Sequence, residues 1–211
     1  PTDALLFLTE AVGVSALVRY DATLSSIHGA ALRFNGITAA IVGNASSGKS
    51  TTLLACARSG MQVYSDERVL TRHGIVYPYL RTCSVRADAA RRLFDDVTHD
   101  ALRAWLNDRG LSPRELALQD VFGPQAVAPP AALRAVFVID GYAASPRIEE
   151  LHPANALPAV TRWLDAKGDA FDRMGRGLRL LRGVACYRIA LGMPRASVAA
   201  IRETVQSLSS S

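Results

Sequence analysis

Residues 43–50 have the types and spacing of a loop that binds phosphate groups. They read Gly-Asn-Ala-Ser-Ser-Gly-Lys-Ser, which satisfies the pattern G-x-x-x-x-G-K-S/T between an apolar stretch and a helical one. In such a loop the backbone N–H groups surround phosphate oxygens, the lysine reaches the β- and γ-phosphates, and the serine hydroxyl can bind Mg²⁺. We therefore expect a nucleotide or polyphosphate to bind here. The residues expected to contact it are Gly43, Asn44, Ala45, Ser46, Ser47, Gly48, Lys49, Ser50 and Thr51.

Two adjacent acidic residues, Asp66 and Glu67, follow the next short apolar stretch. An in-line phosphoryl transfer needs a base beside the acceptor hydroxyl and an acidic ligand for Mg²⁺. Two carboxylates at the end of a strand can divide these two roles, and the sequence does not say which residue takes which. The neighbouring Arg68 can either neutralise a transferred phosphate or pair with a nearby acid.

Asp140 offers an alternative, because it ends the apolar run 135–139. Many phosphate-loop NTPases take an aspartate for Mg²⁺ from such a strand. This alternative predicts a generic ATPase or a nucleotide-dependent regulator that needs no acceptor. Against it, Asn35-Gly36 between two apolar runs predicts a hairpin directly before the loop. The chain also has no NKxD-like or LSGGQ-like segment.

Hydrophobic periodicity and turn residues predict the elements that position these groups. Strands are expected over residues 15–20, 25–34, 37–43, 61–64, 133–139 and 184–190, with further strand and turn over 69–84. Helices are expected over residues 50–59, 86–94, 98–108, 153–166, 169–181 and 195–208. Trp105 and Trp163 fall on apolar helical faces and are expected in the core.

The composition predicts a globular protein with one substantial core. The chain has 211 residues, 49% of them hydrophobic, and we expect one domain with its phosphate-loop core at 15–84 and the remainder at 85–211. The net charge of +5 comes almost wholly from arginine, because Lys49 and Lys167 are the lysines. The arginines form no dense run, which favours a solvated surface over a nucleic-acid site.

The cysteines and the first apolar stretch bear on the compartment. Cys56, Cys83 and Cys186 are odd in number and lack CxxC spacing, so neither a disulfide framework nor a zinc site is expected. The apolar stretch 4–18 contains Glu10 and is too short to span a bilayer. We expect a cytoplasmic protein that binds neither nucleic acid nor membrane.

Four features in this order resemble the catalytic core of the HPr kinase/phosphorylase family, whose fold is related to phosphoenolpyruvate carboxykinase. They are His28-Gly29, the Asn35-Gly36 turn, the loop 43–50 and the segment Ser65-Asp66-Glu67-Arg68-Val69. In that family a His-Gly precedes the hairpin, and an Ala-Asp-Asp-Arg-Val-like segment follows the loop. The resemblance covers about residues 24–72, and Glu67 stands where the family has a second aspartate.

The resemblance implies an α/β fold in which a mixed sheet carries the phosphate loop after an antiparallel hairpin, with a helical C-terminal segment. It implies an ATP-dependent kinase that transfers the γ-phosphoryl group to a serine of a protein or peptide, with Mg²⁺ as cofactor. The implied catalytic residues are His28, Lys49, Asp66 and Glu67. Ser50 and Asp66 would bind the metal, and Arg68 would contact phosphate.

The same resemblance bears on the acceptor and on assembly. The family's bifunctional members carry a glycine-rich signature segment associated with the reverse reaction, and the sequence has no such segment. It therefore resembles a reduced relative with kinase activity alone. Similar stand-alone kinases in lasso-peptide gene clusters modify a serine near the C-terminus of a precursor peptide. An oligomer is compatible with the resemblance.

Overall fold

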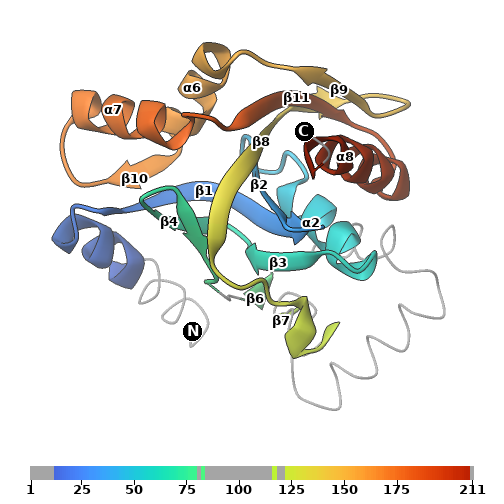
Figure 1. The fold of residues 1–211 in the computed structure, drawn as a ribbon, viewed down its shortest axis with the longest axis horizontal. Helices are drawn as coiled ribbons and strands as arrows, with labels where there is room; N and C mark the ends of the chain where they lie inside the picture. Colours follow the sequence, from blue (N-terminus) through green and yellow to red (C-terminus); the bar gives the residue numbers. More distant parts are fainter. Residues whose placement is uncertain (1–11, 80–81, 84–115, 118–121, 210–211) are drawn as a thin grey trace.

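The computed structural model describes residues 12–79, 82–83, 116–117 and 122–209. Within these ranges nine strands form one mixed sheet, which confirms the predicted mixed α/β class (Figure 1). Its strands are β1 (Leu24–Phe34), β2 (Ile37–Val42), β3 (Gln62–Ser65), β4 (Arg68–Arg72), β5 (Ile75–Tyr77), β8 (Ala131–Tyr142), β9 (Arg147–Glu150), β10 (Leu164–Ala166) and β11 (Ala185–Leu191). A separate two-stranded sheet pairs β6 (Thr82–Cys83) with β7 (Leu116–Ala117).

The helices precede, follow and separate these strands. They are a helix at 12–20, α2 (Lys49–Arg58), the short 3-10 helix η1 (Pro124–Ala126), α6 (Pro153–Arg162), α7 (Ala170–Leu180) and α8 (Pro194–Ser209). Among the described helices, none combines the length and apolar character that crossing a membrane requires. The helices predicted over 86–94 and 98–108, together with Trp105, lie outside the described residues.

The hairpin before the phosphate loop forms as predicted. β1 and β2 pair antiparallel around Asn35 and Gly36, whose φ angles of 47° and 81° are both positive, as a type I′ turn requires. Every residue of β2 is buried, and β2 also pairs in parallel with β8. The chain therefore reaches the loop from the interior of the sheet, with a strand bonded on each side.

The core lies on both faces of this sheet. Ile41 and Phe137 point to the face covered by α2 and α8, whereas their neighbours Val42 and Val136 point to the face covered by α6 and α7. Side chains of neighbouring residues in a strand alternate between faces, so both faces of β2 and β8 must be apolar. Burying one such side chain stabilises the fold by about 1.5–3 kcal/mol.

The helix at 12–20 replaces the strand predicted over 15–20. Its buried positions include Val14 and Val18, four residues apart. That spacing fits one face of a helix, whereas a half-buried strand would bury every second residue. The prediction is wrong because the run SALVRY is too short to separate the two periods.

The helix predicted over 153–166 is wrong in its last turn. α6 ends at Arg162, and Leu164–Ala166 forms β10, which pairs with residues 25–27 of β1. This pairing joins segments far apart in the sequence, and no local pattern announces it. Most other described elements lie within a few residues of their predicted ranges, and β9 has no predicted counterpart.

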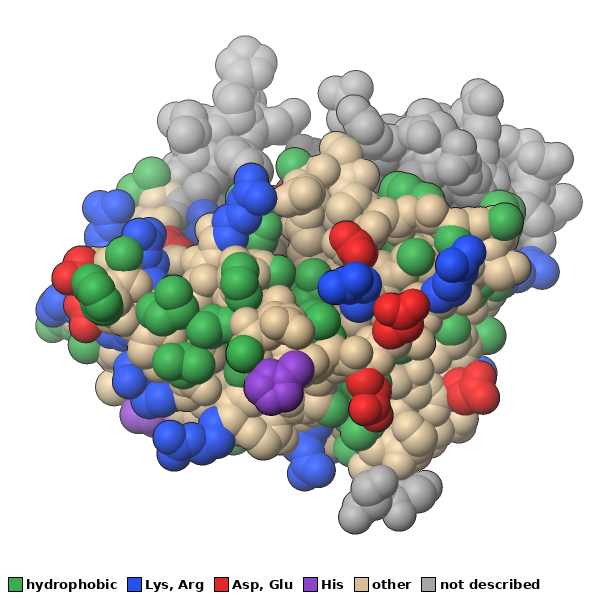
Figure 2. All heavy atoms as spheres, turned by 90° about the horizontal axis from the view of Figure 1, so that it is seen from above, with side chains coloured by type: hydrophobic (Ala, Val, Ile, Leu, Met, Phe, Trp, Pro, Cys, Tyr) green, Lys and Arg blue, Asp and Glu red, His purple; other side chains and the backbone are tan. Residues whose placement is uncertain are grey.

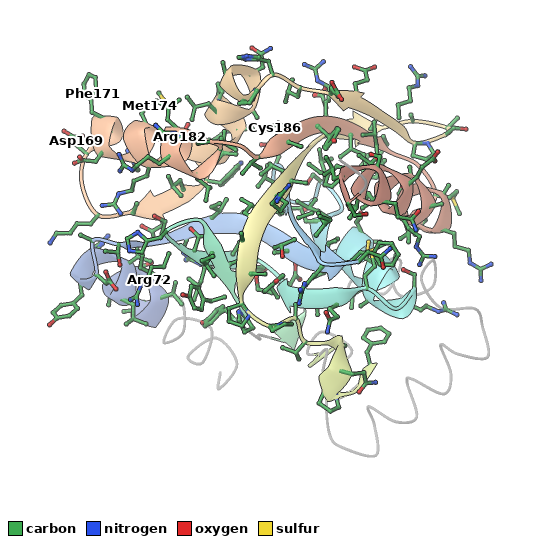
Figure 3. The ribbon with its side chains drawn as sticks, viewed as in Figure 1. Arg72, Asp169, Phe171, Met174, Arg182 and Cys186 are labelled. Carbon is green, nitrogen blue, oxygen red and sulfur yellow. The ribbon has the colours of Figure 1, made fainter. Side chains whose placement is uncertain are left out.

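Helix α7 is amphipathic, but part of its apolar side faces outward. Phe171, Met174 and Leu178 are 87%, 45% and 55% exposed, while Leu180 is buried. Figure 2 shows apolar side chains gathered over the α6 and α7 region, and Phe171 points away from the body in Figure 3. Gly177 lets α7 approach α6, because a Cβ there would lie 2.6 Å from Thr161 Cγ2.

Replacing leucine by alanine should reduce the free energy of unfolding by different amounts on the two faces of α7. Leu180→Ala should lower the free energy of unfolding by about 2–4 kcal/mol, because it leaves a cavity in the core. Leu178→Ala on the same helix should cost less than about 1 kcal/mol, because its side chain is largely in water. Urea unfolding followed by circular dichroism measures both, and equal costs would contradict this arrangement of α7.

Candidate phosphate-transfer site

The loop at 43–48 has a backbone that depends on glycine. Gly48, the residue before α2, has φ 98° and ψ 9°, in the left-handed region. The positive φ strains any residue with a Cβ, and a Cβ on Gly48 would also lie 2.8 Å from Tyr142 Oη and 2.9 Å from Leu191 Cδ1, so the ends of these two side chains would have to move. The loop delivers the chain directly into the first turn of α2, whose N–H groups favour an anion.

Lys49 lies folded over this loop. Its side chain is 6% exposed, and Nζ donates hydrogen bonds to the carbonyl oxygens of Gly43 at 2.9 Å and Asn44 at 2.8 Å. Burial lowers the pKa of Lys49, while the charges of Asp66 and Glu67 act in the opposite direction. The ammonium group is thus held where loop and acid pair meet.

The acid pair reaches the loop through a side-chain hydrogen bond. Ser50 Oγ, in the first turn of α2, donates to Asp66 Oδ1 at 3.0 Å, and Asp66 is 2% exposed. A hydroxyl and a carboxylate side by side are oxygen ligands of the kind that Mg²⁺ takes alongside water and phosphate. Among the described residues no three or more His, Cys, Asp or Glu side chains gather as a metal cage.

The acids sit at the junction between β3 and β4. β1 pairs with both strands, Ala31 opposite Ser65 and His28 opposite Arg68, so Asp66 and Glu67 fall between the two paired segments. Glu67 has φ 66°, a conformation that costs a residue with a Cβ roughly 1–3 kcal/mol. This irregular backbone interrupts strand alternation, and the charges of both carboxylates act on Lys49.

His28 lies beside Glu67 and Lys49. Its ring is 5.3 Å from the Trp163 ring between centroids, tilted by 50°, and its backbone N–H donates to the Trp163 carbonyl at 2.9 Å. Burial lowers the pKa of His28 below 6.5, and the Lys49 charge lowers it further, against an opposing contribution from Glu67. The imidazole is therefore neutral near pH 7.

Arg68 is held by an acid, one of the two roles the sequence left open. Its guanidinium lies 3.4 Å from Asp165 Oδ2, and Ser15 Oγ donates to the same oxygen at 3.0 Å. Asp165 belongs to β10, which pairs with β1 on the side opposite to β4, so Arg68 reaches it across β1. The predicted residues His28, Lys49, Ser50, Asp66, Glu67 and Arg68 thus occupy one region of the structure.

Asp140 has different surroundings. Its side chain is 62% exposed and lies 3.5 Å from Arg188 Nε, whereas the carboxylate that Ser50 contacts is Asp66. Ile139, the preceding residue of β8, faces Gly43, and the register of β8 against β11 shifts between Ile139 and Tyr142, so regular alternation does not extend past Asp140. At the end of β8 it is Tyr142 that approaches the loop.

Three residues of this region were not predicted as part of it. Tyr142 packs against the loop glycine, Trp163 packs on His28, and Asp165 pairs with Arg68. Trp163, predicted in the core, is half-buried at the end of α6 and packs against the core on the face that α6 and α7 cover. These contacts join segments far apart in the sequence, so no local pattern predicts them. The one partial signal was the expectation that Arg68 pairs with an acid, and Asp165 is that acid.

No protein-family model matches the chain, and no curated protein sequence matches it. Among solved structures, the chain is similar to the HPr(Ser) kinase/phosphatase from Coxiella burnetii, with 13% identity and a TM-score of 0.45. That alignment covers 87% of this chain and 98% of the other.

The environment of His28 predicts its titration. We expect the midpoint of the His28 ring protons in an NMR titration to lie below 6.5, and Lys49→Met to raise it by removing a nearby cation. Because the pKa of His28 is lower in the folded chain, the unfolded chain binds a proton more readily. Protonation of His28 therefore reduces the free energy of unfolding as the pH falls below 6.5. A midpoint above 6.5 would contradict the burial and charge described here.

Proposed function

We propose that this chain is a cytoplasmic ATP-dependent kinase that transfers the γ-phosphoryl group to a serine hydroxyl of a protein or peptide. The observation that carries the proposal is the 3.0 Å hydrogen bond from Ser50 to Asp66, which joins the phosphate loop to the acid pair. A loop alone would support nucleotide binding. A loop with two carboxylates and a neutral histidine beside it supports transfer to an acceptor.

The loop fits the polyphosphate of a nucleotide in three respects. Its glycines allow a backbone that presents N–H groups, and it runs into the positive end of α2. The Ser47 hydroxyl is buried with no hydrogen-bond partner in the described part of the chain. Lys49 bonds two loop carbonyls, and phosphate oxygens can replace these as charge-assisted partners.

Ser50 and Asp66 are the residues that would hold Mg²⁺. Their oxygens are already adjacent, one neutral and one anionic, at the first turn of α2. When bound, the ion would neutralise charge on the phosphate oxygens as the γ-phosphoryl group is transferred. Burial of Asp66 keeps this carboxylate away from competing water and fixes its direction toward the loop.

Glu67 is then the residue assigned to the acceptor. It is less buried than Asp66 and lies next to neutral His28, which can orient a carboxylate without adding a positive charge. The acceptor oxygen forms a bond to the γ-phosphorus, and its proton passes to the Glu67 carboxylate. The bond from the γ-phosphorus to the bridging oxygen breaks, and ADP leaves with that oxygen.

The acceptor class rests on the resemblance of residues 24–72 to kinases that act on serine. A ribosomal precursor peptide is the first acceptor to test, because similar stand-alone kinases modify such peptides. The site is consistent with a flexible acceptor, since Glu67 and His28 are both partly exposed.

Transfer of label from γ-labelled ATP tests the proposal. Wild type with Mg²⁺ and peptides from its host should label a serine, and Lys49→Ala or Glu67→Gln should reduce the rate by at least about 10²-fold. Asp140→Asn is the matched control and should leave the rate near that of wild type. Phosphate release without a labelled acceptor, lost in Asp140→Asn but kept in Glu67→Gln, would instead establish the ATPase alternative.

Substitutions of the two carboxylates should affect different steps, one the binding of ATP and the other the transfer of the phosphoryl group. Asp66→Asn should weaken Mg²⁺-dependent binding of ATP, because it removes an anionic ligand beside Ser50. Glu67→Gln should leave ATP affinity nearly unchanged while abolishing transfer, because it removes only the proton acceptor. Calorimetric titration with a non-hydrolysable ATP analogue, with and without Mg²⁺, measures both. The reverse pattern would exchange the two roles.

A further inference from the structure

A pocket of about 320 Å³ lies between α2 and α8. It adjoins the C-terminal end of α2, whereas the phosphate loop adjoins the other end, and a helix of ten residues is about 15 Å long. Three arginines, Arg58, Arg195 and Arg202, line the pocket together with small or apolar side chains and Ser59. No acidic residue is among the described residues that line it.

The arginines flank an apolar floor. Arg195 and Arg202 are seven positions apart on α8, so they lie on one face about two turns from each other. Val198 lies between them on that face, and Ala55 lines the pocket from α2. Arg58, from the last turn of α2, contributes the third positive charge from the opposite wall.

Arg202 is fixed in position and retains a donor. Its Nη2 donates to the Ser59 carbonyl at 2.8 Å, and its guanidinium carbon lies 5.1 Å from the centre of the Phe34 ring. Its Nε is buried and has no hydrogen-bond partner in the described part of the chain. The hydrogen bond to Ser59 and the packing on Phe34 hold this guanidinium in place at the wall of the pocket, so little order has to be gained when an anion binds.

A structural role at a helix end accounts for Arg202 but not for Arg195. Arg202 satisfies a carbonyl at the end of α2, which is an ordinary structural role for one arginine. Arg195 stands instead in the first turn of α8, a helix of sixteen residues, where a positive side chain is unfavourable beside the positive end of the helix. Both the side chain and the helix end favour an anion at this place.

We propose that this pocket binds a small organic anion with a phosphoryl or carboxylate head and an apolar body. Guanidinium groups bind both heads through paired hydrogen bonds, and the floor of Ala55 and Val198 accommodates the apolar part. The volume is at the small end of ligand pockets, which fits one small molecule. The proposal does not depend on the kinase assignment, because it uses no residue of the phosphate-transfer site.

Phenyl phosphate and benzoate are suitable probes, titrated by calorimetry at constant ionic strength. The Lys49→Ala chain serves as the background, so that binding at the phosphate loop is weakened before the pocket is tested. We expect one site for at least one probe, with affinity reduced at least about tenfold by Arg195→Ala or Arg58→Ala. Arg134→Ala, an exposed arginine on β8, is the control and should leave affinity unchanged.

Amide chemical shifts locate the binding independently. The probe that binds should shift the first turn of α8 and the last turn of α2, with little change at residues 43–48. Preference for phenyl phosphate or for benzoate decides the head group. Absence of binding by both probes, or equal affinity in Arg195→Ala and Arg134→Ala, would overturn the proposal. Because the kinase assays use other residues, either proposal can fail while the other stands.

Discussion

The candidate site depends on the simultaneous pairing of β1 with the strand that leads into the phosphate loop and with the strands that carry the acids. β1 pairs with β2 on one side and with β3, β4 and β10 elsewhere along its length. Gly29 makes the close approach possible, because a Cβ there would lie 2.7 Å from the Ile41 carbonyl oxygen. Ser50 follows β2 and Asp66 follows β3, so the pairing of both strands with β1 brings the two side chains within hydrogen-bond distance.

This arrangement concentrates charge in a poorly solvated place, and its charges compensate one another. Lys49 is buried beside Asp66 and Glu67, which offset the cost of desolvating an ammonium group. His28 stays neutral, so it adds no second cation next to Lys49. The left-handed backbone at Glu67 is a further local cost. Costs of this kind are typical of sites shaped for a ligand rather than for stability.

The part of this site that consists of short sequence patterns could be predicted from the sequence. The phosphate loop, the Asn35-Gly36 turn and the acid pair are short patterns whose backbone requirements show in the residues themselves. The contacts of Trp163 and Asp165 do not, because they join residues more than 90 positions apart, as in the Arg68 to Asp165 bond. Strand β10 was misread for the same reason, since its partner β1 decides its conformation and its own residues do not.

Helix α2 relates the two proposed sites, because each lies at one of its ends. The middle of α2 is packed in the core through the buried side chains Thr52, Leu53 and Leu54. Burial also raises the pKa of the nearby Cys56 thiol to about 12, so this thiol remains protonated. Such a helix is held as one rigid element. Substitutions more than about 10 Å apart generally act independently. An anion at the far end of α2 would therefore leave the loop geometry intact and occupy its pocket without competing with a nucleotide.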